Sequence, residues 1–224
     1  MNSVAKTLTT LEAYERWAPT YPPEPHNPLM RAEQEALLSH LPDVAGRRVL
    51  DLACGSGRYA RILAAAGASQ VVAADFSMAM LARVTTGNRV RADLTSLPFA
   101  GGSFDLVMSG LAIGHAADLG ACLREIARVL SPGGTLHYSD FHSDAAHAGL
   151  TRSFRDATNQ SFTLPPAGFS LDVHRTAARD AGLVIESIEE LRVGLEFREI
   201  FAGSDAFYQR WHGVPLAFVV RARK

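Results

Sequence analysis

The segment that most constrains this chain runs from Val49 to Arg58 and reads VLDLACGSGR. A short apolar run leads into a turn that contains Gly55 and Gly57, and helical periodicity follows the turn. Glycines in such a turn let the backbone approach a ligand closely, and the helix directs its N-terminus at that ligand. The segment therefore predicts a strand–turn–helix unit with a ligand site, while a tight turn without a ligand is the simpler alternative.

Short apolar runs and helical periods alternate along the rest of the chain. We expect further strands at residues 70–75, 89–92, 104–109, 135–141, 183–190 and 214–222, and helices at 8–18, 28–41, 58–66, 119–130 and 171–181. This alternation favours an α/β fold, in which helices cover both faces of a mostly parallel sheet. Ligands of such sheets bind beyond the carboxyl ends of the strands, which is where the glycine turn lies.

Composition narrows the class of protein. The chain has 224 residues, of which 47% are hydrophobic and 20% charged. At roughly 100–200 residues per domain, this length favours a single compact domain over residues 1–224. The formal net charge of −1 provides no basic field, so we expect no nucleic-acid partner.

Membrane, secretory and metal signals are absent from the sequence. No apolar run approaches the roughly 18 residues that span a bilayer, so we expect no membrane partner. The N-terminal residues lack the apolar core of a signal peptide, which favours a cytoplasmic location. Cys54 and Cys122 form neither a disulfide framework nor a zinc pattern, so we expect no metal.

Two aspartates indicate the chemistry of the ligand that the glycine turn would bind. Residues 55–60 fit the dinucleotide fingerprint G-x-G-x-x-A, but Asp51 just before the glycines would repel a pyrophosphate and attract an ammonium group. Asp75 ends the next expected strand, where a carboxylate suits the two hydroxyls of a ribose. The pattern therefore indicates a ligand with a ribose and a cationic group. Capping the next helix is the structural alternative for Asp75, but Ser77 already suits that role.

Asp93 ends the third expected strand and has two interpretations. Its carboxylate suits a hydrogen bond from an exocyclic amine of the ligand. The alternative is a purely structural role, in which it organises the turn before Leu97 and Pro98.

Four consecutive segments carry a family resemblance. They read VLDLACGSGRYA, VVAADFSMAML, ADLTSLPFAGGSFDLVMSGLAIGHAADL and LREIARVLSPGGTLHYSDFH, and together cover about residues 47–142. They resemble the successive motifs of class I S-adenosylmethionine (SAM)-dependent methyltransferases. They are most similar to a small-molecule group that includes quinone C-methyltransferases and the malonyl-carrier O-methyltransferase of biotin synthesis. Two departures are Ala53, where the family usually has glycine, and Gly114, where many members carry histidine.

The resemblance implies a Rossmann-like fold and SAM as the cofactor. The implied sheet has seven strands in the order 3-2-1-4-5-7-6, with the seventh antiparallel. The implied contacts are Asp51, Ala53, Gly55, Gly57 and Ser109 for the methionine part of SAM, Asp75 for the ribose, and Phe76, Asp93 and Leu94 for the adenine.

Two further segments are candidates for covering the site. Residues 1–41 include YERWAPTYPP, which resembles the tyrosine-bearing cap of the family, so Tyr14, Trp17 and Tyr21 are expected in a lid; simple aromatic packing is the alternative. Residues 143–170 are too long for an ordinary strand-to-helix turn, so we expect a substrate-shaping insertion, or else an amphipathic helix at the domain edge. The aromatic stretch 197–211 is a candidate for another pocket wall.

The methyl group on the sulfonium of SAM is already strongly electrophilic, so the protein mainly has to align the acceptor with it and exclude water. An amine or carboxylate acceptor needs no base, whereas a phenol or an activated carbon benefits from one. His142 is the first candidate for such a base, with Asp140 on the same face of its strand either to orient it or to bind substrate. A structural or surface histidine is the alternative interpretation. His115, after the fourth strand, is the second candidate; the family resemblance also allows a structural role, in which it holds the start of the next helix through Asp118.

These observations predict an enzyme that transfers the methyl group of SAM to an oxygen, carbon or nitrogen atom of a small molecule. The alternatives are a nucleic-acid or protein methyltransferase, an NAD-dependent reductase and a non-catalytic SAM-binding module. A nucleic-acid enzyme should show a basic face or an Asn-Pro-Pro-Tyr type motif, and the sequence shows neither. Asp51 disfavours the reductase, and turnover would exclude the binding module.

Overall fold

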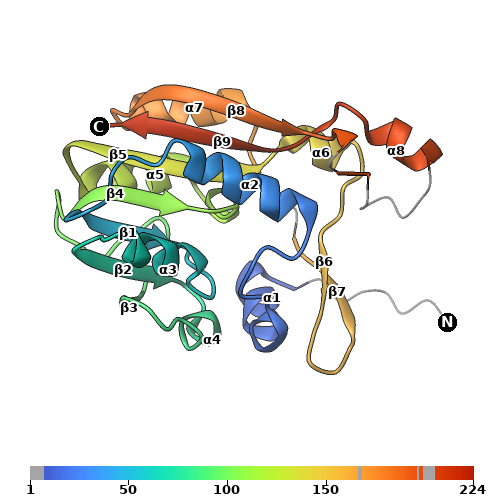
Figure 1. Cartoon of the computed structure of the whole chain (residues 1–224), viewed down its shortest axis with the longest axis horizontal. Coiled ribbons are helices and arrows are strands. Elements are labelled where there is room, and N and C mark those ends of the chain that lie inside the picture. The colour runs from blue at the N-terminus through green and yellow to red at the C-terminus, as the bar shows by residue number, and fades with distance from the viewer. Residues whose placement is uncertain (1–7, 166–167, 196, 199–204) are drawn as a thin grey trace.

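A seven-stranded sheet forms the centre of the computed structural model, which describes residues 8–165, 168–195, 197–198 and 205–224 (Figure 1). The strands are β1 (Arg48–Leu52), β2 (Gln70–Asp75), β3 (Asn88–Arg91), β4 (Phe104–Ser109), β5 (Leu130–Phe141), β8 (Val184–Arg192) and β9 (Pro215–Arg223). Their order is β3-β2-β1-β4-β5-β9-β8. Strands β1 to β5 pair in parallel, whereas β9 is antiparallel to β5 and to β8. Counted along the chain, β8 and β9 are the sixth and seventh strands of this sheet. The predicted fold class and the predicted strand order, 3-2-1-4-5-7-6, are therefore confirmed.

Helices cover both faces of this sheet. They are α1 (Thr10–Trp17), α2 (Pro28–Ser39), α3 (Arg58–Ala65), α4 (Met78–Leu81), α5 (Leu119–Val129), α6 (Ser143–His147), α7 (Leu171–Asp180) and α8 (Asp205–Trp211), with short 3-10 turns at η1 (Ala18–Thr20) and η2 (Ile113–His115). Along β1, Val49 belongs to the hydrophobic cluster that includes α2 and α3 side chains, while Leu50 belongs to the cluster that includes α5 and α7 side chains. Adjacent strand residues point to opposite faces, so a strand buried on both sides is continuously apolar.

Helix starts follow the capping residues in the sequence. Thr9 and Glu12 form a reciprocal capping box at α1. Asn27 caps α2 by accepting a hydrogen bond from the Met30 N–H (2.9 Å), with Pro28 at the first helical position. Because side-chain caps satisfy backbone groups that the helix leaves unpaired, these two starts were predictable from sequence.

Strand β5 begins earlier than predicted. Leu130 already pairs with Phe104, and regular pairing resumes at Thr135 opposite Leu106. Residues 131–134 belong to the strand: the register with β4 shifts there, while Gly133 donates to Lys224 O (3.2 Å) and Lys224 donates to Gly134 O (3.0 Å). The expected start at residue 135 is therefore wrong.

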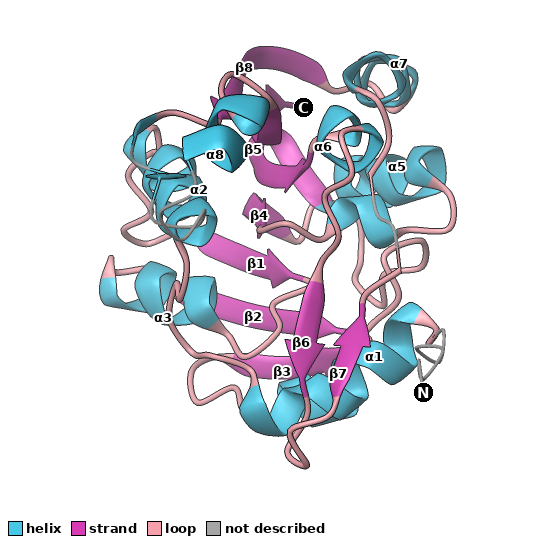
Figure 2. Ribbon diagram, turned by 90° about the vertical axis from the view of Figure 1, so that its right-hand side faces the viewer, coloured by secondary structure: helices cyan, strands magenta, loops and turns pink. Residues whose placement is uncertain are grey.

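The segment 143–170 does not form one amphipathic helix. Helix α6 is short, and a hairpin of β6 (Ser153–Arg155) and β7 (Ser161–Thr163) follows it. The hairpin and α1 lie together at the carboxyl ends of the parallel strands (Figures 1 and 2). No helix in the described ranges is long and apolar enough to cross a membrane.

Candidate functional site

A cavity of about 500 Å³ opens at the carboxyl ends of the parallel strands. Its walls come from α1 and the segment after it, from the turns that follow β1 to β4, and from the start of the β6–β7 hairpin. Most of the residues that the sequence singled out line this cavity, namely Tyr21, Asp51, Ala53, Gly55, Asp75, Phe76, Asp93, Leu94 and His115.

The turn after β1 has a left-handed backbone at three positions. Ala53, Gly55 and Gly57 have φ values of 53°, 54° and 81°. A Cβ atom at Gly57 would lie 3.0 Å from Val84 Cγ1, so only glycine fits there without a shift. Gly57 starts α3 and does not line the cavity, whereas Ala53 and Gly55 do. The glycines therefore shape the backbone of the cavity wall.

Asp51 presents one oxygen with no partner. Its Oδ2 accepts a hydrogen bond from the Ala60 N–H (2.8 Å), while Oδ1 is buried and has no hydrogen-bond partner among the described residues. Burial raises the pKa of Asp51 to about 7, because a charged carboxylate loses its hydration there. A cation placed at Oδ1 would offset that loss.

The carboxylate of Asp75 is held by two backbone N–H groups. Gly55 donates to Oδ2 (2.8 Å) and Ser77 donates to Oδ1 (2.9 Å). Ser77, as expected, caps α4 by accepting from the Met80 N–H (3.1 Å). Since each carboxylate oxygen has a second lone pair, Asp75 can still accept hydrogen bonds from a ligand at the cavity wall.

Asp93 organises the turn that follows it, as its structural interpretation predicts. Its Oδ1 accepts hydrogen bonds from the backbone N–H of Thr95 (2.8 Å) and from its hydroxyl (2.5 Å). It also lines the cavity beside Phe76 and Leu94. The turn therefore holds Asp93 at the cavity wall, and the two interpretations are compatible.

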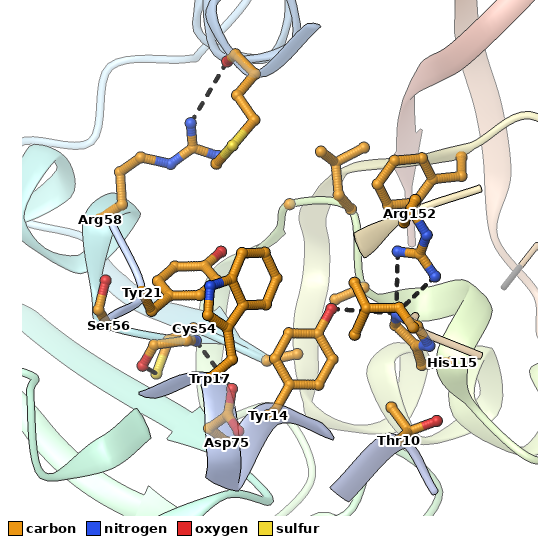
Figure 3. A pocket seen from close by; sticks show the side chains of 18 of the residues that line it. Thr10, Tyr14, Trp17, Tyr21, Cys54, Ser56, Arg58, Asp75, His115 and Arg152 are labelled. Atoms are coloured by element: carbon orange, nitrogen blue, oxygen red, sulfur yellow. Dashed lines mark hydrogen bonds between the residues drawn. The ribbon is translucent and has the colours of Figure 1, made fainter. Parts of the chain in front are cut away.

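Three donor groups converge on His115 (Figure 3). Tyr14 Oη lies 3.2 Å from His115 Nε2, and both terminal nitrogens of Arg152 lie 3.4 Å from the same atom. Arginine can only donate, so Nε2 is unprotonated and the Tyr14 hydroxyl donates to it as well. Burial, together with the Arg152 charge, lowers the pKa of His115 to about 3. His115 is therefore a neutral hydrogen-bond acceptor.

Comparison with known proteins assigns the domain. Residues 50–138 match a family described as "Methyltransferase domain". A structure of an S-adenosylmethionine dependent methyltransferase from Mesorhizobium loti is similar over 86% of this chain and 98% of that chain, with 29% identity and a TM-score of 0.67. Residues 50–138 therefore carry a SAM-dependent methyltransferase domain. The domain is thus an enzyme domain with SAM as its cofactor.

Curated relatives of this methyltransferase domain are named for two different acceptors. A malonyl-[acyl-carrier protein] O-methyltransferase of Enterobacter lignolyticus is 36% identical over 137 residues, or 59% of this chain and 53% of that protein. A demethylmenaquinone methyltransferase of Clavibacter sepedonicus is 44% identical over 105 residues, or 44% of this chain and 42% of that protein. The chain spans about half the length of the curated relatives it matches.

His142 lies outside the cavity of the methyltransferase domain, and the prediction that it is the general base finds no support in its position. Its Nδ1 accepts from the Asp144 N–H (3.1 Å) to cap α6, and its Nε2 lies 3.3 Å from Glu190 Oε1. The His142 N–H donates to Leu216 O (3.0 Å), so pairing with β9 continues past Phe141. Alternation along β5 then directs Phe141, rather than its neighbours, to the cavity.

Asp140 and Ser109 also lie away from the expected contacts. Asp140 faces His174, with 3.6 Å between Oδ2 and Nε2, and does not orient His142. A Cβ atom at Gly114 would lie 2.5 Å from Asp140 Oδ2, which explains why this methyltransferase domain has no histidine there. Ser109 is fully buried and does not line the cavity; the next residue, Gly110, does.

Sequence reasoning missed a buried ion pair beside the cavity. Glu33 on α2 is fully buried; it accepts from Arg58 (2.9 Å), from the Tyr59 hydroxyl (2.8 Å) and from Ser139 (2.6 Å). A Cβ atom at Gly110 would lie 2.5 Å from Tyr59 Cε2, so glycine there leaves room for this network. Its members are far apart in the sequence, and no local signal joins them. Throughout the described part of the chain, no group of His, Cys, Asp or Glu is placed to hold a metal ion.

Proposed function

We propose that this protein transfers the methyl group of SAM to an oxygen, carbon or nitrogen atom of a small-molecule acceptor. The observation that carries the proposal is the buried Oδ1 of Asp51 beside the Gly55 turn, which has no hydrogen-bond partner in the described part of the chain and lies in the same cavity as Asp75. One carboxylate suits the ammonium of the methionine part of SAM, and the second suits the hydroxyls of its ribose. The match to the methyltransferase domain family covers the same turn.

The cavity residues fit this cofactor part by part. Asp51 would bind the ammonium of the methionine part, with Ala53 and Gly55 allowing its close approach. Asp75 would accept hydrogen bonds from the ribose hydroxyls. The adenine end and its cover are assigned to Phe76, Asp93, Leu94 and Tyr21. We assign no direct contact to Ser109, and Gly57 acts through the shape of the turn.

When bound, SAM supplies a methyl group on a positively charged sulfur, which is already strongly electrophilic. The protein's own contribution is then to hold the acceptor in line and to exclude water. Tyr14, Trp17 and Tyr21 line the cavity from the N-terminal side and Arg152 lines it from the insertion. These segments are proposed to form the lid and the substrate-shaping cover.

His115 is proposed to position its neighbours rather than to take a proton. Its pKa of about 3 makes it a weak base, and its Nε2 already accepts hydrogen bonds from Tyr14 and Arg152. General bases act best when their pKa lies near the working pH. The acceptor we propose is therefore one whose nucleophilic atom needs no histidine base.

A small molecule, free or carried by a protein, is preferred over a nucleic acid as the acceptor. The net charge of −1 provides little attraction for a phosphate backbone. The relatives named for malonyl-[acyl-carrier protein] and demethylmenaquinone support the same class of acceptor. A cytoplasmic location stays a prediction from the sequence.

An acceptor screen tests this function. The protein is incubated with SAM and a panel of carboxylic acids, amines, phenols and quinols, and mass spectrometry follows S-adenosylhomocysteine (SAH) and products heavier by one CH₂ group. Formation of both, in equal amounts, is expected for at least one compound class. A protein that binds neither SAM nor SAH would contradict the proposal.

A further inference from the structure

Two arginines line the cavity, and they differ in how their charge is balanced. Arg58 forms an ion pair with Glu33 (2.9 Å) and also donates to Gln34 Oε1 (3.3 Å), on the α2 side of the cavity. Arg152 contacts His115 and the Pro165 carbonyl, and forms no ion pair with any residue that the structure describes. The cavity therefore contains one neutralised and one unneutralised guanidinium.

Arg152 is held in place from several sides. Its guanidinium lies 4.1 Å from the centre of the Phe141 ring, and one terminal nitrogen donates to Pro165 O (3.0 Å). Both terminal nitrogens also face His115 Nε2 at 3.4 Å. These contacts fix the side chain without using all five of its N–H donors. A fixed fork with spare donors is well suited to bind a planar anion.

The groups around Arg152 do not cancel its charge. His115 is neutral, and the Tyr14 hydroxyl donates to His115 Nε2, the atom that Arg152 also contacts. Asp140 interacts with Arg152 electrostatically, but it is fully buried, its Oδ1 accepts from the Phe141 N–H (2.8 Å), and it forms no ion pair with Arg152. Because partly desolvated charge is costly when unpaired, an anionic ligand would be favoured at this position.

The opposite charges are separated within the cavity. Asp51 and Asp75 belong to the part assigned to the cationic cofactor, and Arg152 belongs to the insertion side. Apolar side chains, Leu29, Met30, Leu150, Trp211 and Leu216, form another part of the wall. An acceptor that complements this arrangement has an anionic group and a compact apolar body.

We propose that Arg152 is the anchor for a carboxylate group of the acceptor, whose apolar body lies against Leu150, Trp211 and Leu216. The inference rests on the proposed function, since it assigns the half of the cavity that SAM leaves for the acceptor. The anchored carboxylate is not the methylated group. Esterification would remove the charge that the guanidinium stabilises, and a contact that is stronger in the ground state than in the transition state opposes the reaction.

A binding experiment on the SAH-loaded protein tests this anchor. The two tryptophans of the chain, Trp17 and Trp211, both line the cavity, so intrinsic fluorescence reports on its occupancy. The probes are benzoate and its neutral counterpart benzamide, with phenyl phosphate as a third. Benzoate is expected to bind about tenfold tighter than benzamide, as is typical of a charge-assisted hydrogen-bonded pair.

Variants of Arg152 show whether the preference for benzoate depends on this side chain or on a general change in the protein. Arg152→Gln should remove the preference for benzoate, and Arg152→Lys should keep part of it because the charge remains. The matched control is Arg155→Gln on the same hairpin, where the exposed Arg155 donates to Asn159 O and lies outside the cavity lining; it should leave the preference unchanged. SAH affinity, measured by calorimetry on each variant, confirms that the cofactor site is intact.

Each outcome bears on one proposal. Three results would overturn the carboxylate anchor: equal affinity for benzoate and benzamide, no saturable binding of benzoate, or an unchanged preference in Arg152→Gln. If SAH still binds in these experiments, the proposed function is unaffected. Phenyl phosphate binding more than about tenfold tighter than benzoate would overturn the carboxylate assignment. Failure to bind SAH would instead count against the proposed function.

Discussion

At the residue scale, Asp75 carries the most direct prediction for cofactor binding. Replacing it with alanine removes two proposed hydrogen bonds to the ribose from a charged acceptor, so the affinity for SAM should fall about 10–100-fold. Calorimetry with SAH measures the change. Asp172→Ala, at an exposed aspartate in the first turn of α7, is the control and should bind as the parent does. Unchanged affinity in Asp75→Ala would remove the ribose assignment.

Asp51 predicts how cofactor binding depends on pH. Its pKa of about 7 in the free protein means that the carboxyl is mostly protonated below that pH, whereas binding an ammonium requires the carboxylate. Affinity for SAM should therefore be full above pH 7 and fall up to about tenfold per unit as the pH drops from 7 to 5.5. Asp51→Asn should bind weakly at every pH in this range. A parent affinity that is flat between pH 5.5 and 7.5 would refute the assignment.

Ala53 predicts a gain in stability on mutation to glycine. With φ at 53°, its backbone lies in the left-handed region, which costs an L-residue roughly 1–2 kcal/mol. Glycine removes that strain but loses about 0.5–1 kcal/mol through the entropy of the unfolded chain. Ala53→Gly should therefore raise the free energy of unfolding by about 0.5–1 kcal/mol in urea titrations. A lower midpoint than that of the parent would show that the alanine methyl group packs favourably.

At the element scale, α1 and the β6–β7 hairpin contact each other, and we propose that they form one cover. Trp17 stacks on Phe154 with ring centres 5.1 Å apart, and Arg16 forms an ion pair with Asp156 (3.1 Å). Thr20 also donates to Arg155 O (2.8 Å). Because these contacts join two segments far apart in sequence, a motion of one should involve the other.

This cover predicts linked protection on cofactor binding. SAH should slow amide hydrogen exchange in residues 10–20 and in the hairpin at 153–163 together, with α7 as an unaffected reference segment. Protection of α1 without the hairpin would show that the two segments move separately. Equal exchange with and without SAH would leave only the packing interpretation of Tyr14, Trp17 and Tyr21.

The limits of sequence reasoning also belong to the scale of elements. Glycine positions, caps such as Asn27 and Ser77, and apolar runs such as β2 act locally, so they could be predicted. His142 was misplaced because the face that a residue presents depends on how far β5 pairs with β9. Arg152 and Glu33 were missed because Arg152 meets His115, 37 residues away, and Glu33 meets Arg58, 25 residues away, where local periodicity has no information.

At the scale of the whole molecule, the sheet order brings the turns after β1, β2, β3 and β4 to one edge. Parallel strands place all their carboxyl ends together, so Asp51, Asp75, Asp93 and His115 line one cavity although they come from separate motifs. The N-terminal segment and the insertion then meet over that edge (Figure 2). The topology thus explains why residues spread along the chain line one cavity.

Calorimetric titration of the protein with SAM and, separately, with NADH tests the central claim most directly. Both ligands carry a ribose and an adenine, but only NADH carries a pyrophosphate, which Asp51 should repel. The account predicts saturable one-to-one binding of SAM, much weaker or no binding of NADH, and weakened SAM binding in Asp51→Asn. Tight binding of NADH with none of SAM would contradict it.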